Sequence, residues 1–305
     1  MATQTQIQQH SDLIDSILDD FDDFMESAEK TLENKVAKRI LETKTIDELL
    51  ELRVPLTEDY RTLVQERVRA YIDNFDTLAK DGAEMTGDGI TPVDNRIVAE
   101  LKAQSYARLD ETVKQNKESV NTEIVVGALA GLAVQQIATN SRHAISGLMI
   151  TVDDLEITRL QNRLRKLRVA GESAKEEIAA TLSQLKKKFA GVNVGSSLSK
   201  KMSADMHDTV MDFDGVFVKH RARQAGLSKF RYGGTLVAES RDFCIRNQGK
   251  TFTEAEANSL WSSESWSGKR SGDPFVVRGG HRCRHFWIPV AVSYTHLTLP
   301  TNCVV

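Results

Sequence analysis

The chain has 305 residues, of which 40% are hydrophobic and 27% are charged. This is the composition of a globular protein of about two domains and excludes a disordered chain. The formal net charge of −3 gives no overall basis for binding nucleic acid or membranes. The longest apolar run, 124–134, is well short of the ~20 residues that a membrane-spanning helix needs, so it predicts a buried helix and no membrane span.

The first part of the chain predicts a series of helices. Residues 11–42 carry apolar side chains three and four positions apart, with Asp and Glu opposite, which is typical of an amphipathic helix. Thr45 and Glu48 have the spacing of a capping box and predict a second helix start. We expect Pro55 to interrupt that helix, and a new one to run from Thr57 to about Lys80.

More helices are expected downstream. Thr91 followed by Pro92 predicts a helix start, with the helix continuing to about 117. Further helices are expected near 123–139, where Gly127 would allow close helix approach, over 153–190, and over 199–225.

The pattern changes at Gly226. Segments 230–232 and 235–237 flank two glycines and predict a hairpin, and 247–250 predicts a turn. Thr253 and Glu256 form a second capping-box signature, opening a helix to about Trp261. After a polar loop, 275–277 and 286–288 are expected to be short strands. The predicted fold is therefore mainly α, with a helical body at 1–225 and a small α+β Cys/His module at 226–291.

The last residues, 292–305, form a segment of their own. Residues 292–301 read VSYTHLTLPT, which matches the in-frame translation of a sequencing adapter. We therefore expect 292–305 to be an adapter-derived tail, with the natural C-terminus unknown, and exclude Cys303 and His296 from the site. The alternative is a native strand and turn.

The module carries an ordered set of short motifs. They are Tyr232-Gly233-Gly234, Arg241-Asp242-Phe243-Cys244, Gly249-Lys250, and Gly279-Gly280-His281-Arg282-Cys283-Arg284-His285-Phe286-Trp287. In content and order this set, about sixty residues long, resembles the C-terminal region of the phage minor head, or head-morphogenesis, proteins of the Mu F-like family. No single motif is specific, so the ordered set carries the resemblance.

The resemblance implies a structural role rather than an enzyme. Members of this family are minor components of tailed-phage heads that act in procapsid assembly near the portal. The expected partners are the portal protein and inner capsid or scaffold proteins, and the expected location is the host cytoplasm during assembly and then the virion head. Absence of an export signal and scarcity of cysteine agree with synthesis in a reducing cytoplasm.

The module's Cys and His residues have three readings. Cys244, His281, Cys283 and His285 would suit a structural zinc ion, since two thiolates and two imidazoles match tetrahedral zinc. Many family members instead carry Cys-x-x-Cys and end in Cys-Arg-Cys. The alternatives are a Cys244–Cys283 disulfide, which a cytoplasmic origin disfavours, and plain core packing. No other cofactor is predicted.

Two further functions are weighed against the structural one. Cys244 and His285 could act as nucleophile and base, but no third orienting group is evident, and Gly249-Lys250-Thr251 lacks the frame of a phosphate-binding loop. An internal virion protein that contacts packaged DNA or membrane during ejection is the second alternative. Its basis is a basic stretch (Arg159, Arg163, Arg165, Lys166, Arg168 and 186–188), whose helical spacing equally fits a solvated helix face.

Overall fold

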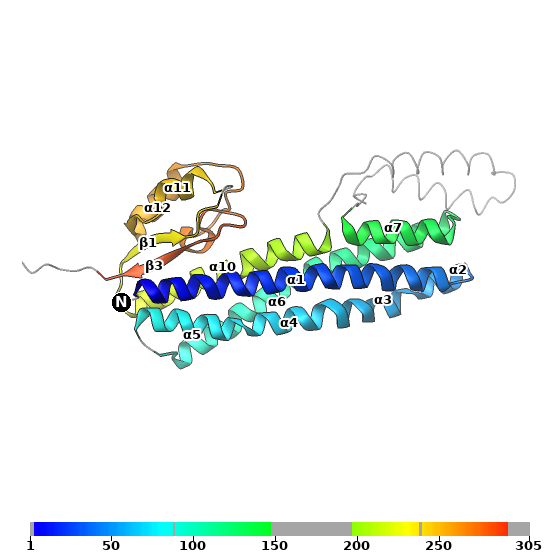
Figure 1. Ribbon diagram of the computed structural model, residues 1–305, viewed down its shortest axis with the longest axis horizontal. Coiled ribbons are helices and arrows are strands. Elements are labelled where there is room, and N and C mark those ends of the chain that lie inside the picture. The colour runs from blue at the N-terminus through cyan, green and yellow to red at the C-terminus, as the bar shows by residue number, and fades with distance from the viewer. Residues whose placement is uncertain (1–2, 88, 148–196, 238–239, 292–305) are drawn as a thin grey trace, which may run out of the picture. The chain divides into compact units, whose positions relative to one another are not determined.

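A computed structural model describes residues 3–87, 89–147, 197–237 and 240–291 (Figure 1). The predicted helix over 153–190, its basic residues and the tail at 292–305 lie outside these residues. The described chain is mainly helical, with one small antiparallel sheet, as the sequence predicts. It forms two compact units: unit 1 comprises 1–14, 75–99 and 208–305, and unit 2 comprises 15–74 and 100–207. The predicted module at 226–291 falls within unit 1.

The N-terminal helices begin with α1 at Gln4–Glu42, which carries the expected amphipathic stripe. Then follow α2 at Ile46–Glu51, α3 at Arg53–Tyr60, a π-helical turn at Arg61–Gln65, α4 at Glu66–Asp73 and α5 at Phe75–Thr86. Thr45 caps α2 as predicted, its hydroxyl accepting from the Glu48 N–H. The interruption predicted at Pro55 lies at Leu52 instead, between α2 and α3. Pro55 itself is in the first turn of α3, where its missing N–H costs no helix hydrogen bond.

The later helices are α6 at Pro92–Leu129, α7 at Val134–Ser146 and α10 at Leu198–Gln224. Thr91 caps α6 as expected, with its hydroxyl accepting from the Asp94 N–H. The predicted boundary near 117 is wrong. The helix continues through the apolar segment and stops near Gly131, whose positive φ of 66° suits glycine. Gly127 allows the expected close approach, since a Cβ there would lie 2.7 Å from Ile137 Cγ1.

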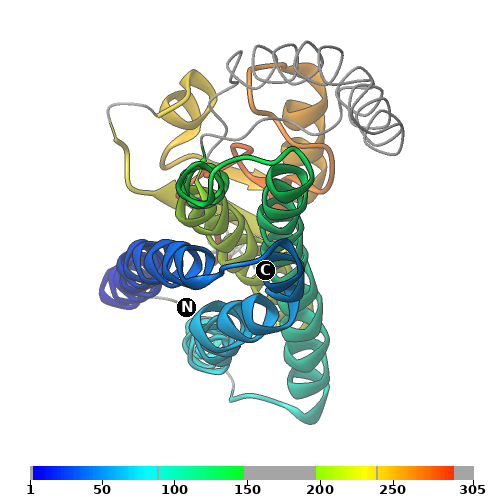
Figure 2. The same ribbon diagram turned by 90° about the vertical axis from the view of Figure 1, so that its right-hand side faces the viewer.

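Unit 2 is a bundle whose helices run alongside one another (Figure 1, Figure 2). Its core takes fully buried side chains from one face of α1: Phe21, Met25, Leu32, Val36 and Ile40. Polar contacts tie the helices together at defined points. The Tyr60 hydroxyl donates to Asn116 Oδ1 over 2.6 Å, and Asn116 Nδ2 donates to the Ala144 carbonyl over 3.0 Å. Arg39 binds the buried Asp59 through two hydrogen bonds.

The sheet belongs to unit 1 and has the strand order β2-β1-β3, both pairs antiparallel. Its strands are β1 at Lys229–Gly234, β2 at Thr251–Thr253 and β3 at His285–Val290. The predicted hairpin is wrong, because β1 pairs with β2 and β3 rather than with 235–237. The strand predicted at 286–288 is confirmed as part of β3.

Three short helices complete the module: α11 at Asp242–Asn247, α12 at Glu254–Ser263 and α13 at Pro274–Val277. The capping box of Thr253 and Glu256 opens α12 as predicted. The strand predicted at 275–277 is wrong. The Asp273 carboxylate accepts a hydrogen bond from the Phe275 N–H, and Pro274 occupies the first helical position. These local interactions favour a helical turn over a strand.

The two faces of the sheet differ. Phe230, Tyr232 and Trp287 lie on the face that packs into an aromatic core with Phe243, Trp261 and Phe275.

A second buried feature of unit 1 lies on its helices. The fully buried His10 ring bridges Asp81, at 2.5 Å, and Asp214, at 2.9 Å, and so links α1, α5 and α10.

Candidate metal centre

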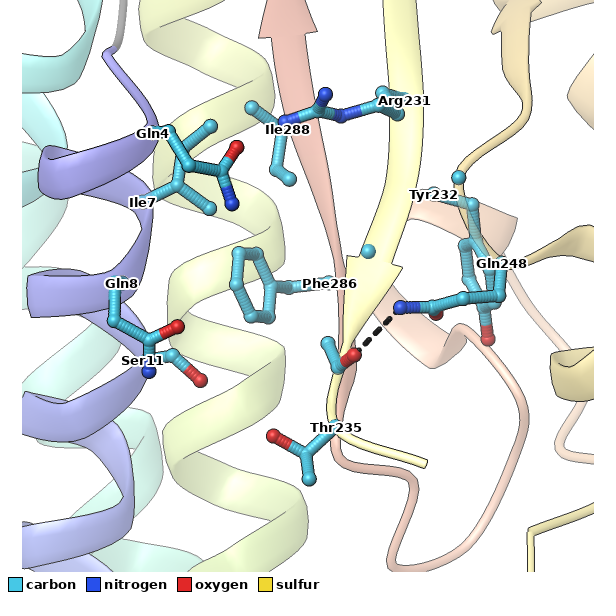
Figure 3. Close-up of a pocket in the computed structure, with 13 residues that line it drawn as sticks. Gln4, Ile7, Gln8, Ser11, Arg231, Tyr232, Thr235, Gln248, Phe286 and Ile288 are labelled. Carbon is cyan, nitrogen blue, oxygen red and sulfur yellow. Dashed lines mark hydrogen bonds between the residues drawn. The ribbon is translucent and has the colours of Figure 1, made fainter. Parts of the chain in front are cut away.

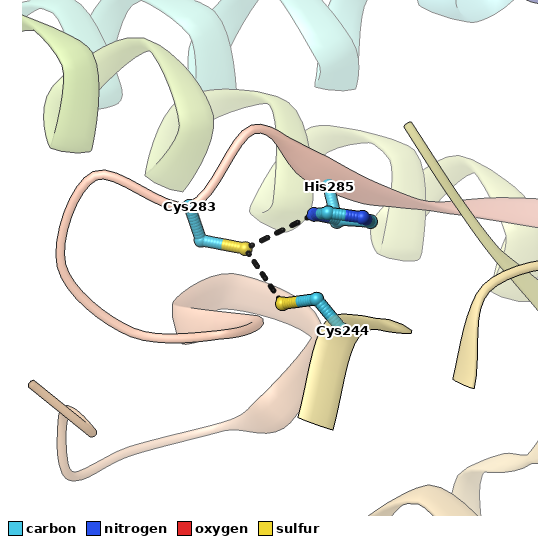
Figure 4. A group of neighbouring side chains, drawn as sticks. All are labelled: Cys244, Cys283 and His285. Carbon is cyan, nitrogen blue, oxygen red and sulfur yellow. Dashed lines mark hydrogen bonds between the residues drawn. The ribbon is translucent and has the colours of Figure 1, made fainter. Parts of the chain in front are cut away.

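Three of the four predicted ligands converge in unit 1. Cys244 lies on α11, Cys283 in the turn before β3, and His285 is the first residue of β3. Figure 4 shows the two sulfur atoms and the imidazole facing one another. Their ligand atoms all lie within 4.8 Å of one another, and all three side chains are buried.

Two of the three donor separations fit a tetrahedral zinc ion. Zinc takes thiolate sulfur at about 2.3 Å and imidazole nitrogen at about 2.0 Å, which places two sulfurs about 3.8 Å apart and sulfur and nitrogen about 3.6 Å apart. The Cys244 and Cys283 Sγ atoms are 3.7 Å apart, and Cys283 Sγ lies 3.6 Å from His285 Nδ1. Both cysteines are free thiols here, and their separation far exceeds the ~2.05 Å of a disulfide.

The pKa values of the two thiols are shifted in opposite directions. The hydrogen bond to Cys283, together with burial, raises the pKa of the Cys244 thiol. The same hydrogen bond, supported by His285, holds the pKa of Cys283 well below its usual range. A reactive catalytic thiolate would also need access to substrate, and the Cys283 side chain is only 3% exposed.

The fourth predicted ligand, His281, lies elsewhere. Its imidazole is 63% exposed, and Nδ1 lies 2.9 Å from Asp208 Oδ2 on α10. The strand geometry that would have pointed His281, Cys283 and His285 to one side begins only at His285. Residues 281 and 282 form a turn in which Arg282 has a φ of 54°, so the alternation fails there.

Two further residues lie at the cluster, and neither is among the predicted metal ligands. The Tyr232 hydroxyl lies 3.3 Å from Cys244 Sγ and 3.6 Å from Cys283 Sγ, and its ring stacks on His285. Arg278 is 1% exposed and pairs with Asp212 at 3.3 Å, and its guanidinium is also near enough to Cys283 and Tyr232 to interact with them electrostatically. Tyr232 was noted only as part of the family motif, and an arginine within a polar and glycine-rich stretch gives no signal of burial.

The motif glycines allow the backbone to approach the cluster. A Cβ on Gly279 would lie 2.5 Å from Cys283 Sγ and 2.6 Å from Cys244 Sγ, so any side chain there would displace the sulfurs. A Cβ on Gly280 would lie 2.1 Å from the Gly268 carbonyl oxygen, and its φ is 99°. Gly234, with a φ of 131°, meets the Arg284 carbonyl at the end of the sheet in the same way.

Other motif residues hold the segments around the cluster. Phe243 stacks on Trp266, whose indole N–H donates to the Gly279 carbonyl over 2.9 Å. Arg241 donates to the His281 carbonyl over 2.7 Å. The Trp287 indole N–H donates to the Pro274 carbonyl, and the Lys250 carbonyl accepts from the Tyr232 N–H. Asp242 lies in the first turn of α11, where a carboxylate is favoured. The Gly249 N–H donates to the Tyr232 carbonyl.

A pocket of about 220 Å³ lies on the other face of the sheet (Figure 3). Residues near the start of α1, including Gln4 and Gln8, form one wall, and Phe286 and Ile288 form part of the other. Gly233 also lines the pocket, and Ile288 packs over it, since a Cβ on Gly233 would lie 2.7 Å from Ile288 Cδ1. The pocket is separate from the Cys/His cluster, whose thiols lie on the core face.

Among the described residues, no helix is long and apolar enough to cross a membrane. Comparisons with protein-family models, with curated proteins and with solved structures find no match to this chain. The resemblance to the phage head family therefore rests on the ordered motif set of the module.

Proposed function

We propose that the chain is a minor structural protein of a tailed-phage or prophage head, acting in head morphogenesis next to the portal. In this proposal the module is held together by a structural zinc ion on Cys244, Cys283 and His285. Its partners are the portal protein and inner capsid or scaffold proteins.

One observation carries the proposal. Motif segments far apart in the sequence converge on a single buried cluster, where they act as packing, capping and close-approach residues. Tyr232 and Gly279 both touch the two sulfur atoms, and Phe243 and Trp287 pack against Tyr232. This is the arrangement expected if the motif preserves a fold rather than a reaction.

The chemistry of the cluster supports a structural metal over catalysis. The donor set of two thiolates and an imidazole is one that zinc favours. A catalytic zinc or a nucleophilic cysteine needs an open, accessible position, whereas all three donors here are buried. A zinc ion would also add stability to a module with a small core of its own.

The genetic setting and the assembled particle test the role. We expect portal and terminase genes immediately upstream, and the chain itself in heads purified after prophage induction, at low copy number relative to the major capsid protein. A stop codon early in the gene should reduce the yield of DNA-filled heads. Normal heads from that mutant, together with absence of the chain from wild-type particles, would refute the proposal.

A further inference from the structure

The cluster provides three metal donors within the described residues, and a closed structural zinc site needs four. His281 is held by Asp208 and exposed. No other described Cys, His, Asp or Glu joins the group of three. Among the described residues, a fourth donor would therefore be another kind of side chain, in a place that is buried.

The Tyr232 hydroxyl has the geometry of that fourth donor. On a tetrahedral zinc ion an oxygen ligand at about 2.0 Å lies about 3.5 Å from each sulfur. The Tyr232 oxygen lies 3.3 Å from one Sγ and 3.6 Å from the other, so it faces the gap between the two thiols. Stacking on His285, with the rings 5° from parallel, and burial on the core face of β1 fix the position of the phenol.

Charge balance gives a second, independent observation. Zinc with two thiolates and a neutral imidazole is neutral, so a phenolate would leave one negative charge in a buried site. The Arg278 guanidinium is buried beside this cluster, and its Nε and Nη1 have no hydrogen-bond partner in the described part of the chain. Nη2 donates to Asp212 Oδ1 over 3.3 Å, as an ion pair. Asp212 is an anion beside Arg278, but it engages only one of the three guanidinium nitrogens, and buried donors without partners are costly.

The backbone at Arg278 supports this assignment. Its φ is 47° with a ψ of −122°, a conformation that side-chain-bearing residues rarely adopt. Such strain persists only where the surroundings impose it, and it is concentrated at functional sites. Here it places the guanidinium in the core immediately before Gly279, which packs on both sulfurs.

We propose that the Tyr232 oxygen is the fourth zinc ligand and that Arg278 is a positioning residue that offsets the resulting negative charge. On binding, each thiol and the phenol lose a proton to solvent as the metal–sulfur and metal–oxygen bonds form, with no change in oxidation state. The inference rests on the zinc site of the proposed function but not on the phage-head role.

Metal binding to the full chain tests this ligand set. Wild-type, Tyr232→Phe, His281→Ala and Cys244→Ser proteins are titrated with Co²⁺ and with Zn²⁺ against a chromophoric chelator. We expect Tyr232→Phe to weaken Zn²⁺ binding at least about tenfold and to change the Co²⁺ visible spectrum, because a ligand is lost while the ring that packs the core remains. His281→Ala should behave as wild type, and Cys244→Ser should bind far more weakly.

A spectroscopic readout separates ligation from a hydrogen bond. Metal binding to wild type should produce the ultraviolet difference spectrum of one tyrosinate, which Tyr232→Phe should lack. Arg278→Met, if its near-ultraviolet circular dichroism remains native, should bind zinc more weakly while keeping the tyrosinate signal. Unchanged affinity and spectrum in Tyr232→Phe, loss of metal in His281→Ala, or weaker binding with no tyrosinate signal in wild type would each overturn the assignment.

The test also distinguishes failure of this inference from failure of the proposed function. If wild type binds zinc without tyrosinate, only the role of Tyr232 falls. If wild type binds no zinc, the structural zinc and this inference fall together. The phage-head role is judged by particle composition and gene order, which do not depend on the metal.

Discussion

Unit 2 and unit 1 bury different kinds of side chain. The bundle of unit 2 packs aliphatic and aromatic groups that repeat along single helices, such as Phe21, Met25 and Leu32 on α1. The sheet-bearing part of unit 1 packs aromatic rings, two thiols and an arginine drawn from segments up to about fifty residues apart. Bringing such widely separated segments together costs more chain entropy. A cross-link between them should therefore add more to the free energy of unfolding than it would in a helical bundle.

The units also bury ionisable groups in contrasting ways. In unit 1, His10 lies between two carboxylates that pair with it. In unit 2, Glu123 on α6 is 8% exposed, and burial raises its pKa to about 7, opposed by a hydrogen bond with Asn140. The charge of His10 is therefore compensated by its two partners, whereas Glu123 keeps most of the cost of burying a carboxylate. Each contrast can be tested by changing the group on which it depends.

Metal removal should have the largest effect and should be confined to the sheet-bearing part of unit 1. Structural zinc sites contribute on the order of 10 kcal/mol to folding in small domains. We expect a strong chelator to abolish the near-ultraviolet circular dichroism of the three tryptophans, all of which lie in or against this core. Far-ultraviolet helicity should fall much less. An unchanged tryptophan signal after complete chelation would mean that packing alone holds the module.

Gly279→Ala should have the next largest effect. Its Cβ would lie within about 2.6 Å of both sulfurs, so the cluster must open, at a cost of about 3 kcal/mol or more, and zinc should be lost. Urea denaturation and metal analysis measure the two effects. Gly89→Ala is the matched control, because nothing lies within 4 Å of a Cβ at that position. Full zinc content in Gly279→Ala would contradict the packing described here.

His10 should give unit 1 a pH dependence. Burial lowers the pKa of His10, but Asp214 and Asp81 outweigh it and raise the pKa from 6.5 to about 9. The folded state thus binds the proton more tightly, so its stabilisation, about 3 kcal/mol, is complete below pH 6.5 and is lost as the pH rises through 9. Urea midpoints from pH 6 to pH 10 measure it. A His10→Gln variant that keeps the wild-type slope would rule His10 out as the cause.

Glu123→Gln should stabilise unit 2. A carboxyl with a raised folded pKa favours folding while protonated, and that advantage disappears as the pH rises from 4.5 through 7. At pH 8 the neutral amide should therefore raise the free energy of unfolding by about 2 kcal/mol, with little gain at pH 4. Thermal unfolding at the two pH values tests this. The exposed Glu118→Gln serves as control, and an equal gain there would point to net charge instead of burial.

Thr253→Ala should have the smallest effect. It removes the capping box at the start of α12, where Thr253 and Glu256 exchange hydrogen bonds, and should cost about 1 kcal/mol. Urea denaturation followed by tryptophan fluorescence would detect this loss, because Trp261 lies on the same helix. Ser262→Ala, which loses only an exposed hydrogen bond to a carbonyl within the helix, should change stability by much less.

The sequence determined the parts of this protein whose causes are local. The stripe of α1, the caps at Thr45, Thr91 and Thr253, and the mainly helical class with a small mixed module all follow from spacing and capping. The local predictions that were wrong or displaced also have local causes. Pro55 sits harmlessly in a first helical turn, and Asp273 with Pro274 makes a helical turn of an apolar triplet that looked like a strand.

Only the tertiary structure decided which chemical groups meet. The sequence predicted Cys244, Cys283 and His285 as candidate donors, but it grouped His281 with them by alternation, which the turn at Arg282 interrupts. It gave no sign that Tyr232 would face both thiols or that Arg278 would be buried beside them. Pairing of β1 with β3 sets these contacts, and strand pairing between distant segments depends on the packing of the whole core rather than on any short stretch of residues.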